Sequence, residues 1–356
     1  MRNISSKAVT ALRLATVVAL AIGFGLARAA GMTGFAYSGN ERDASISEIA
    51  LATGQVRTFT IPIMPHNVQV TPDGAYLLAV GMPAGDHGKD GAQPAPGTPP
   101  MHEMKADEEG KLLVFDVRNL EKPAATLPAG EHPAHVVTDR QGRRAFVTDS
   151  GENRIIVLDL ARHSVIGKVR TGAYPHGLRP SPDGRELYVA NVEAGSVSVV
   201  DTKALKEVAR IPVGKGPVQV AFTPDGHQVY VTLRDENAVA VVDAATRRVI
   251  GKIAVGRNPI QVYATPDGKT MYVANQGTAE NPDDKVSVID VATRKVIATV
   301  TTGAGAHGVV VGDAGRTAFV TNVEAGTVSA IDTASQQVNM TFKVGAGPNG
   351  ITYRKE

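Results

Sequence analysis

The sequence predicts an all-β fold, a seven-bladed β-propeller whose blades are four-stranded antiparallel sheets. One unit, Pro175–Gly216, contains four short apolar runs, each bounded by a turn, and the same pattern begins again at Pro217. The glycine that ends the first turn of each unit recurs at a nearly constant spacing. A single sheet of this kind cannot bury both of its faces, so the units are expected to stack on one another.

The unit that begins at Pro175 contains the four expected strands. The run HGLRP (176–180) is the first strand, and the turn SPDG (181–184) follows, with Gly184 supplying a positive φ. The run ELYVAN (186–191) is rich in β-branched and aromatic residues, as strands usually are. SVSVVD (196–201) alternates polar with apolar residues, which indicates a half-buried strand, and EVARIPV (207–213) completes the sheet.

The spacing of the turn glycines gives the number of blades. They lie at Gly74, Gly142, Gly184, Gly226, Gly268 and Gly315, so the steps are 68, 42, 42, 42 and 47 residues. A period in this range with four strands per repeat is typical of propellers. The chain ends supply the seventh blade. FAYSGN (35–40), SISEIA (45–50) and QVRTFTI (55–61) are its outer strands, and PNGITYRKE (348–356) is the inner strand that closes the ring, giving one domain over residues 30–356.

These motifs resemble those of the YVTN-repeat, YncE-like family of secreted β-propellers. The naming tetrapeptide has counterparts in FVTD (146–149), YVAN (188–191), YVTL (230–233), YVAN (272–275) and FVTN (319–322). The TPDG and SPDG turns and the runs VSVVD (197–201) and VSVID (286–290) are similar as well. The resemblance covers almost the whole chain after residue 29 and implies the propeller fold. It does not specify an activity, because one fold supports many functions.

The first 29 residues have the pattern of a secretory signal peptide. Basic residues precede an apolar run, Leu14–Ala27, and the small-x-small triplet Ala27-Arg28-Ala29 follows. The alternative is an uncleaved membrane anchor, but the run is shorter than the roughly 20 residues that a span needs. No other stretch of the sequence is long and apolar enough to span a membrane. We therefore expect a periplasmic protein.

Charge and composition exclude several function classes. Four of the 37 Lys and Arg residues and none of the 35 Asp and Glu residues lie in the signal segment, so the remaining chain carries a net charge of −2. This balance does not favour nucleic acid as a partner. The absence of cysteine excludes disulfides, thiolate metal sites and c-type haem attachment. We expect a monomer, with a periplasmic protein as a candidate partner.

Seven of the nine histidines are expected on one face of the propeller. This face carries the loops between second and third strands and the returns that lead into first strands. His66, His176 and His307 begin first strands, His135 is one residue further along, and His132 lies in the return before it. The second-to-third-strand loop of the first complete unit is expanded to residues 82–110, a segment rich in Pro, Gly and charge that carries Met82, His87, Met101, His102 and Met104.

These residues suggest a copper or zinc site at the channel mouth. Imidazole binds Cu(II) or Zn(II), and thioether favours Cu(I). The predicted ligands are His66, His135, His176 and His307, with Met64, His87, Met101, His102 and Met104 as further donors. Four residues of the same face are predicted to contact a small polar ligand: His132, Glu193, Glu324 and Arg234. A shared ion requires some imidazole nitrogens to lie within about 8 Å of one another, because metal–nitrogen bonds are near 2 Å.

Three alternatives are consistent with the same residues. The histidines can be structural, each bonding a neighbouring return loop, although Val218, Ile260 and Asn349 occupy the same position in other units. The protein can be a metal-independent interaction scaffold. It can also be a lyase or lactonase, although the chain has neither a GxSxG nor an HExxH motif. Asn191, Asn275 and Asn322 can bind a polar ligand, or they can stabilise strand ends.

Overall fold

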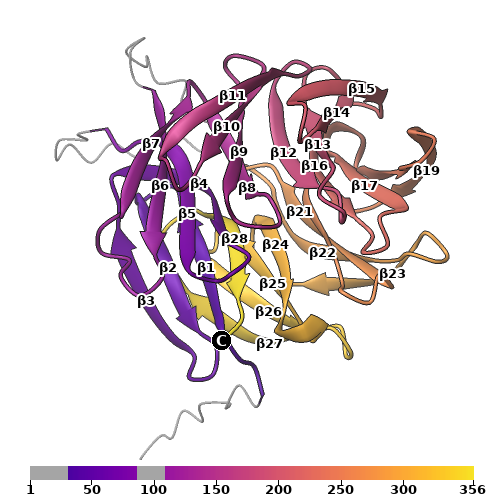
Figure 1. The fold of residues 1–356 in the computed structure, drawn as a ribbon. Helices are drawn as coiled ribbons and strands as arrows, with labels where there is room; N and C mark the ends of the chain where they lie inside the picture. The colour runs from indigo at the N-terminus through magenta and orange to yellow at the C-terminus, as the bar shows by residue number, and fades with distance from the viewer. Residues whose placement is uncertain (1–30, 86–108) are drawn as a thin grey trace, which may run out of the picture.

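The computed structural model describes residues 31–85 and 109–356, which form seven four-stranded antiparallel sheets in a ring (Figure 1). This arrangement confirms the predicted propeller. The predicted signal peptide and residues 86–108 of the predicted insertion lie outside the described residues. Within the described ranges, no helix is long and apolar enough to cross a membrane.

Six blades follow one another along the chain, and each runs from its innermost strand to its outermost. The first three of these blades contain β4 (Ile63–Val70), β5 (Tyr76–Pro83), β6 (Gly110–Asp116) and β7 (Ala125–Gly130); β8 (Pro133–Thr138), β9 (Arg144–Asp149), β10 (Arg154–Asp159) and β11 (Ser164–Arg170); and β12 (Pro175–Pro180), β13 (Glu186–Asn191), β14 (Ser196–Asp201) and β15 (Lys206–Pro212). The next three contain β16 (Pro217–Phe222), β17 (Gln228–Leu233), β18 (Ala238–Asp243) and β19 (Arg248–Ala254); β20 (Pro259–Ala264), β21 (Thr270–Gly277), β22 (Pro282–Asp290) and β23 (Lys295–Thr301); and β24 (Ala306–Gly312), β25 (Thr317–Asn322), β26 (Thr327–Asp332) and β27 (Gln337–Lys343). Two short 3₁₀ turns connect neighbouring strands: η1 (Arg234–Glu236) lies between β17 and β18, and η2 (Asp313–Gly315) lies between β24 and β25.

The seventh blade joins the two ends of the described chain. Its order is β28 (Pro348–Arg354), β1 (Phe35–Asn40), β2 (Ser45–Ala50) and β3 (Gln55–Thr60). The pairing runs from Phe35 opposite Arg354 to Asn40 opposite Pro348, and Figure 1 shows β28 beside β1. The predicted closure is therefore confirmed, and the inner strand of this blade comes from the last residues of the protein. We call it the closing blade.

The tetrapeptide of each second strand holds neighbouring blades together. Its aromatic residue is buried between blades, as for Tyr188, Tyr230 and Tyr272. Where its third residue is threonine, that residue joins two inner strands: the Thr148 hydroxyl accepts a hydrogen bond from the backbone N–H of His135 (3.0 Å) and donates one to the carbonyl of His176 in the next blade (2.7 Å). The repeated motif thus has a structural reason, because it satisfies backbone groups that would otherwise be buried without partners.

The asparagine that ends the tetrapeptide is structural. Asn191 is fully buried, and its amide nitrogen donates to the hydroxyls of Ser196 and Ser198. Asn275 and Asn322 are also buried and donate to serine hydroxyls of their own hairpins. The structure therefore supports the strand-end role of these asparagines over the ligand-binding alternative.

Candidate metal site

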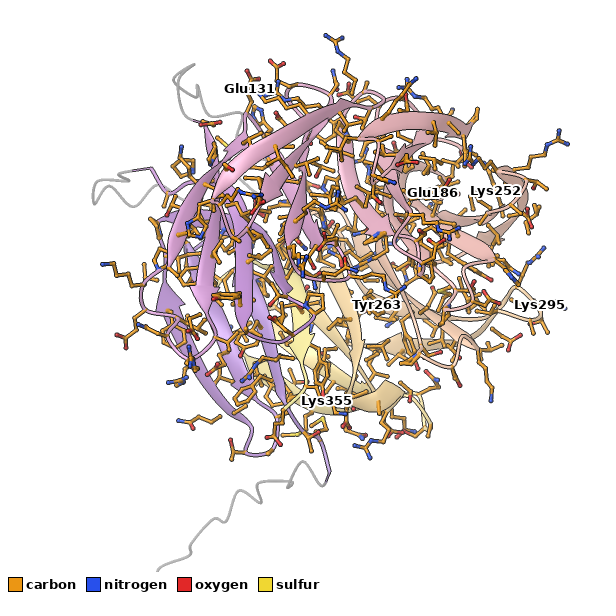
Figure 2. The ribbon with its side chains drawn as sticks, viewed as in Figure 1. Glu131, Glu186, Lys252, Tyr263, Lys295 and Lys355 are labelled. Carbon is orange, nitrogen blue, oxygen red and sulfur yellow. The ribbon has the colours of Figure 1, made fainter. Side chains whose placement is uncertain are left out.

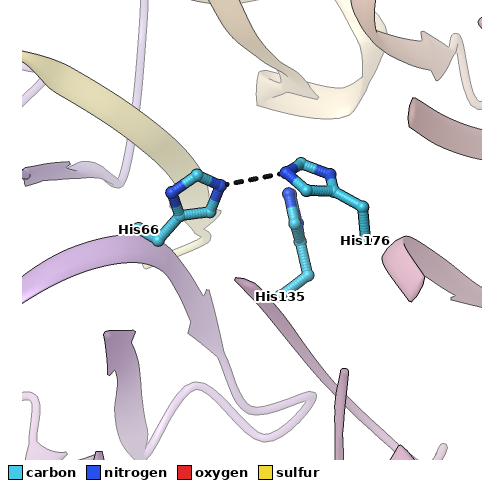
Figure 3. Close-up of side chains that lie close together, drawn as sticks. All are labelled: His66, His135 and His176. Carbon is cyan, nitrogen blue, oxygen red and sulfur yellow. Dashed lines mark hydrogen bonds between the residues drawn. The ribbon is translucent and has the colours of Figure 1, made fainter. Parts of the chain in front are cut away.

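Three imidazoles from three successive blades meet at one mouth of the central channel. His66 comes from β4, His135 from β8 and His176 from β12. One ring nitrogen of each lies within 4.8 Å of the others, so the group could hold a metal ion. Figure 3 shows the three rings turned towards a common point. The separations are well below the 8 Å limit set above, and they bring together three of the four histidines that the sequence analysis placed at the channel mouth.

A bulge at the start of the inner strands makes this convergence possible. In a regular strand, consecutive side chains point to opposite faces, yet His135 and His176 occupy consecutive positions of the repeat. Their ring centroids are nevertheless only 4.8 Å apart. In β8, the pairing with β9 shifts between Pro133 and Val136, and β12 has the same shift between Pro175 and Leu178. A bulge re-aims the residues within it, which allows both rings to face the channel.

Glycines beside two of the histidines let the inner strands approach closely. A Cβ added to Gly177 would lie 2.4 Å from the carbonyl oxygen of Val218 in the next blade. At Gly308, an added Cβ would lie 2.4 Å from the carbonyl oxygen of Asn349. In the sequence His-Gly, the histidine supplies a side chain to the candidate site, and the glycine lets the neighbouring inner strand come close. This close approach of the inner strands keeps the imidazoles near one another.

His66 is held by a carboxylate and an amide of the closing blade. Its Nδ1 lies 3.1 Å from Oε1 of Glu41, in the loop between β1 and β2. The amide nitrogen of Asn349, in β28, donates to the second oxygen of Glu41 (2.5 Å). A histidine that donates one ring N–H to a carboxylate presents the other nitrogen in a fixed orientation, as metal-binding histidines usually do.

The hydrogen bonds of His176 assign its tautomer. Its Nδ1 lies 3.3 Å from the carbonyl oxygen of Val218, which can only accept, so Nδ1 carries the proton and Nε2 presents a lone pair. Nε2 of His66 lies 3.2 Å from this Nε2 and donates to it (dashed in Figure 3). Two Nε2 atoms bound to one ion in a tetrahedral site are roughly 3.3 Å apart. The proton between His66 and His176 therefore occupies the place that a metal ion would take.

His135 contributes a nitrogen with no partner. Its side chain is 3% exposed, and its Nε2 has no hydrogen-bond partner among the described residues. A buried polar atom without a partner is unfavourable by about 1–3 kcal/mol. A ligand that accepts electron density from Nε2 would remove this penalty, and this is the clearest fit between the residues and an ion.

Burial and mutual repulsion keep most of the cluster neutral. Burial lowers the pKa of His135 well below its usual range, and the charges of His176 and His66 lower it further. Burial also lowers the pKa of His176 well below its usual range. His66 is the exception: burial alone would lower its pKa, but the Glu41 carboxylate outweighs that effect and raises it. Two imidazoles that favour the neutral form and one whose protonated form is stabilised by Glu41 result.

His307, the fourth predicted histidine, lies beside the triad. Its ring centroid is 6.5 Å from that of His66, and its Nδ1 is buried without a partner among the described residues. Burial lowers its pKa to about 4, and the charge of His66 contributes to that shift. His307 therefore provides a fourth neutral imidazole at the rim of the triad.

The other predicted contacts lie away from the triad or belong to other interactions. His132 and Glu193 are exposed on the surface. Glu324 forms an ion pair with Arg42, and Arg234 forms one with Asp235.

The predicted sulfur ligands are described only in part. Met64 is the cross-strand partner of Met82, where β5 leads into the expanded loop. The predicted ligands His87, Met101, His102 and Met104 lie outside the described residues.

Glu41 and Asn349 belong to the candidate site, but the sequence analysis did not assign them to it. Asn349 occupies the histidine position of the repeat, and it was noted only as a non-histidine exception. Glu41 lies in a second-to-third-strand loop, one position before the counterparts of Glu193 and Glu324. Applying the face rule to the closing blade would have placed Glu41 at the same mouth.

Comparisons with known proteins agree with the fold. Residues 167–269 match the model of the YncE-like β-propeller family, in accord with the resemblance of the repeats. The structure is similar to hydrazine synthase from Kuenenia stuttgartiensis, with a TM-score of 0.66 and 19% identity over 82% of this chain and 95% of that chain. It is also similar to a functionally unknown protein from Desulfotomaculum acetoxidans, with a TM-score of 0.71 and 14% identity over 91% of this chain and 99% of that chain. No curated protein matches the sequence. At these identities the structural likeness establishes the fold alone.

Proposed function

We propose that this YncE-like β-propeller is an exported, periplasmic protein that binds one copper or zinc ion at the mouth of its central channel. The observation that carries the proposal is the convergence of His66, His135 and His176 from three blades, with ligand nitrogens within 4.8 Å of one another. Each of these three blades supplies one ligand, so the site forms only when the blades pack beside one another in the ring. The pattern of the first 29 residues supports export.

The donor set suits an ion that prefers imidazole. Neutral imidazoles bind Zn(II) and Cu(II), whereas Mg²⁺ and Ca²⁺ prefer oxygen ligands. Three protein ligands leave a fourth position for water, for His307 or for a small exogenous ligand. Met64 and Met82 form a cross-strand pair at the end of β5, and a thioether that reached the ion would favour copper over zinc, since thioether is a soft ligand.

Glu41 and Asn349 would orient the first ligand when the ion binds. Nε2 of His66 and Nε2 of His176 would hold the ion in place of the proton between them, and Nδ1 of His66 would keep its hydrogen bond to Glu41. A copper or zinc ion supplies Lewis acidity, and copper can also change its redox state.

Metal titration of the untagged protein tests the proposal. Protein freed of metal with a chelator is titrated with Cu(II) and Zn(II), and the bound metal is counted by elemental analysis. We expect one ion per chain for the wild type and a loss of at least about 100-fold in affinity for the double variant His66→Ala/His176→Ala, which removes two imidazole ligands. Electron paramagnetic resonance of the Cu(II) form should show coupling to nitrogen nuclei.

The double variant His163→Ala/His227→Ala is the matched control. Both of these histidines are exposed and belong to turns on the opposite face, β10–β11 and β16–β17. The control should bind metal as the wild type does, which separates the site from weak binding to surface histidines. Failure of the wild type to bind any stoichiometric ion, or equal binding by both double variants, would refute the proposal.

A further inference from the structure

A polar cavity of about 120 Å³ lies in the channel below the histidines. It is lined by residues of the inner strands, and the polar ones include Asn67, Gln219, Gln261, Arg179 and Tyr263. His135 belongs to this lining and to the triad, so the cavity adjoins the candidate metal site. The proposed metal-binding function does not use the other residues of this lining.

Three amide side chains of the lining have fixed orientations. Oε1 of Gln261 accepts a hydrogen bond from the backbone N–H of Val309 (3.3 Å), and Oε1 of Gln219 accepts one from the N–H of Val220 (2.9 Å). Oδ1 of Asn67 accepts one from the N–H of Val136 (3.3 Å). A backbone N–H cannot bond an amide NH₂ group, so these contacts place the oxygens at the strands and leave the NH₂ groups for other partners.

The NH₂ groups have no acceptor in the described part of the chain. Gln261 is 4% exposed, and its Nε2 is buried without a hydrogen-bond partner. Gln261 is therefore a buried donor whose acceptor is missing from the described residues. Buried donors of this kind are nearly always satisfied in folded proteins, by protein or by a bound species.

The cavity also contains a cation without a neutralising carboxylate. The Arg179 guanidinium lies 5.2 Å from the ring centroid of Tyr263, with which it forms a cation–π contact. No ion pair between Arg179 and a carboxylate is found among the described residues, whereas Arg42, Arg154 and Arg234 each have one. Figure 2 shows Tyr263 near the centre of the ring, far from the peripheral Lys252 and Lys295. A cation in so confined a place favours an anionic partner.

We propose that this cavity binds a small oxyanion, held by the Arg179 guanidinium and the amide donors of Gln219 and Gln261. The planar fork of arginine binds two oxygens of one oxyanion at once. The cavity volume suits a small ion such as nitrate, bicarbonate, acetate, sulfate or phosphate. Because the described lining residues offer donors and no carboxylate, an anion is preferred over a cation or a neutral sugar.

Anion binding to metal-free protein tests this inference. Thermal unfolding and calorimetric titration are carried out in a zwitterionic buffer at constant ionic strength, with the five sodium salts named above and sodium chloride as the reference. At least one oxyanion should raise the melting temperature of the wild type in a saturable way. Arg179→Gln and Gln261→Leu should each weaken its binding by about 10- to 100-fold, since a hydrogen bond to a charged group is worth about 1.5–3 kcal/mol.

The control variant is Arg185→Gln, in the same blade. Its side chain is 85% exposed in the turn between β12 and β13, so it removes the same charge outside the cavity. This variant should bind the oxyanion within about twofold of the wild type. If no oxyanion binds the wild type, or if Arg179→Gln and Gln261→Leu bind it as the control does, the cavity holds only water and the inference is wrong.

A further variant separates this inference from the metal proposal. His66→Ala/His176→Ala alters the proposed metal ligands but not the amide and arginine donors. The oxyanion should therefore bind this variant with wild-type affinity. Loss of anion binding in this variant would mean that the anion occupies the histidine cluster and not the cavity below it, and would overturn the inference.

Discussion

At the scale of single residues, the histidine cluster combines one ion-paired imidazole with three neutral ones. His66 differs from the others because Glu41 lies 3.1 Å from its Nδ1. The pKa of the Glu41 carboxyl is lowered in turn. Burial alone would raise this pKa, but the attraction of His66 and hydrogen bonds from His66 and Asn349 outweigh burial. One carboxylate thus decides which imidazole carries charge and which nitrogen of that imidazole faces the channel.

Glu41→Gln should weaken metal binding by about 10- to 100-fold, as removal of such an orienting carboxylate usually does. The variant should also lower the pKa of His66, because its neutral amide no longer favours the imidazolium. Both effects are measured on one protein, by competition with a chelator of known affinity and by NMR titration of the ring. Glu193→Gln, at an exposed position of the same face, is the control. An unchanged His66 pKa in Glu41→Gln would contradict this assignment.

At the scale of elements, two features of the strands build the site. The bulges of β8 and β12 let consecutive repeat positions face one channel, and Thr148 joins the backbones of His135 and His176. The same arrangement occurs without histidines two blades further on, where Thr232 accepts from the N–H of Gln219 (3.0 Å) and donates to the carbonyl of Ile260 (2.7 Å). Thr148 and Thr232 can therefore be compared directly: both join two inner strands, but only Thr148 contacts the backbones of proposed ligands.

Thr148→Val should destabilise the protein by about 1–3 kcal/mol, because it leaves a buried N–H and a buried carbonyl without their partner. It should also weaken metal binding, since it frees the backbones of two proposed ligands. Thr232→Val should cost similar stability but leave metal affinity unchanged. Urea unfolding and metal titration of both variants distinguish the two effects. Equal loss of metal affinity in both would show that the threonine acts only through overall stability.

At the scale of the whole molecule, the ring closes and the hub forms together. β28 and the β1–β2 loop bring Asn349 and Glu41 to His66 of the neighbouring blade. The inner strands bury the imidazoles of His135, His176 and His307, and burial favours the neutral form of each ring in the folded state. The unfolded chain, in contrast, protonates each histidine near its ordinary pKa of about 6.5.

The metal-free protein should lose stability as the pH falls from about 6.5 towards 4. Burial lowers the pKa of His307 to about 4, so the unfolded state binds more protons than the folded state over this window, and protonation favours unfolding. The effect of His307 is on the order of 3 kcal/mol at full titration, and His135 and His176 shift in the same direction. His66 acts oppositely: with its raised pKa, its contribution is present at low pH and lost as the pH rises.

Urea unfolding between pH 7 and pH 4 measures this dependence. His307→Leu should flatten the curve, because it removes one of the groups that must stay neutral. His227→Leu, at an exposed position, is expected to follow the wild type. A variant curve for His307→Leu that is as steep as that of the wild type would rule out this histidine as a source of acid sensitivity.

The sequence by itself determined the blade count, the strand positions and the closure of the ring, because each depends on a pattern that repeats locally. Predicted runs such as ELYVAN (186–191) and SVSVVD (196–201) coincide with β13 and β14. The face that carries the histidines also followed from strand order. Only the tertiary structure decided which side chains meet. Bulges override the alternation that places His135 and His176 on opposite faces, and closure brings Glu41 and Asn349 to His66 across separations of 25 and 283 residues.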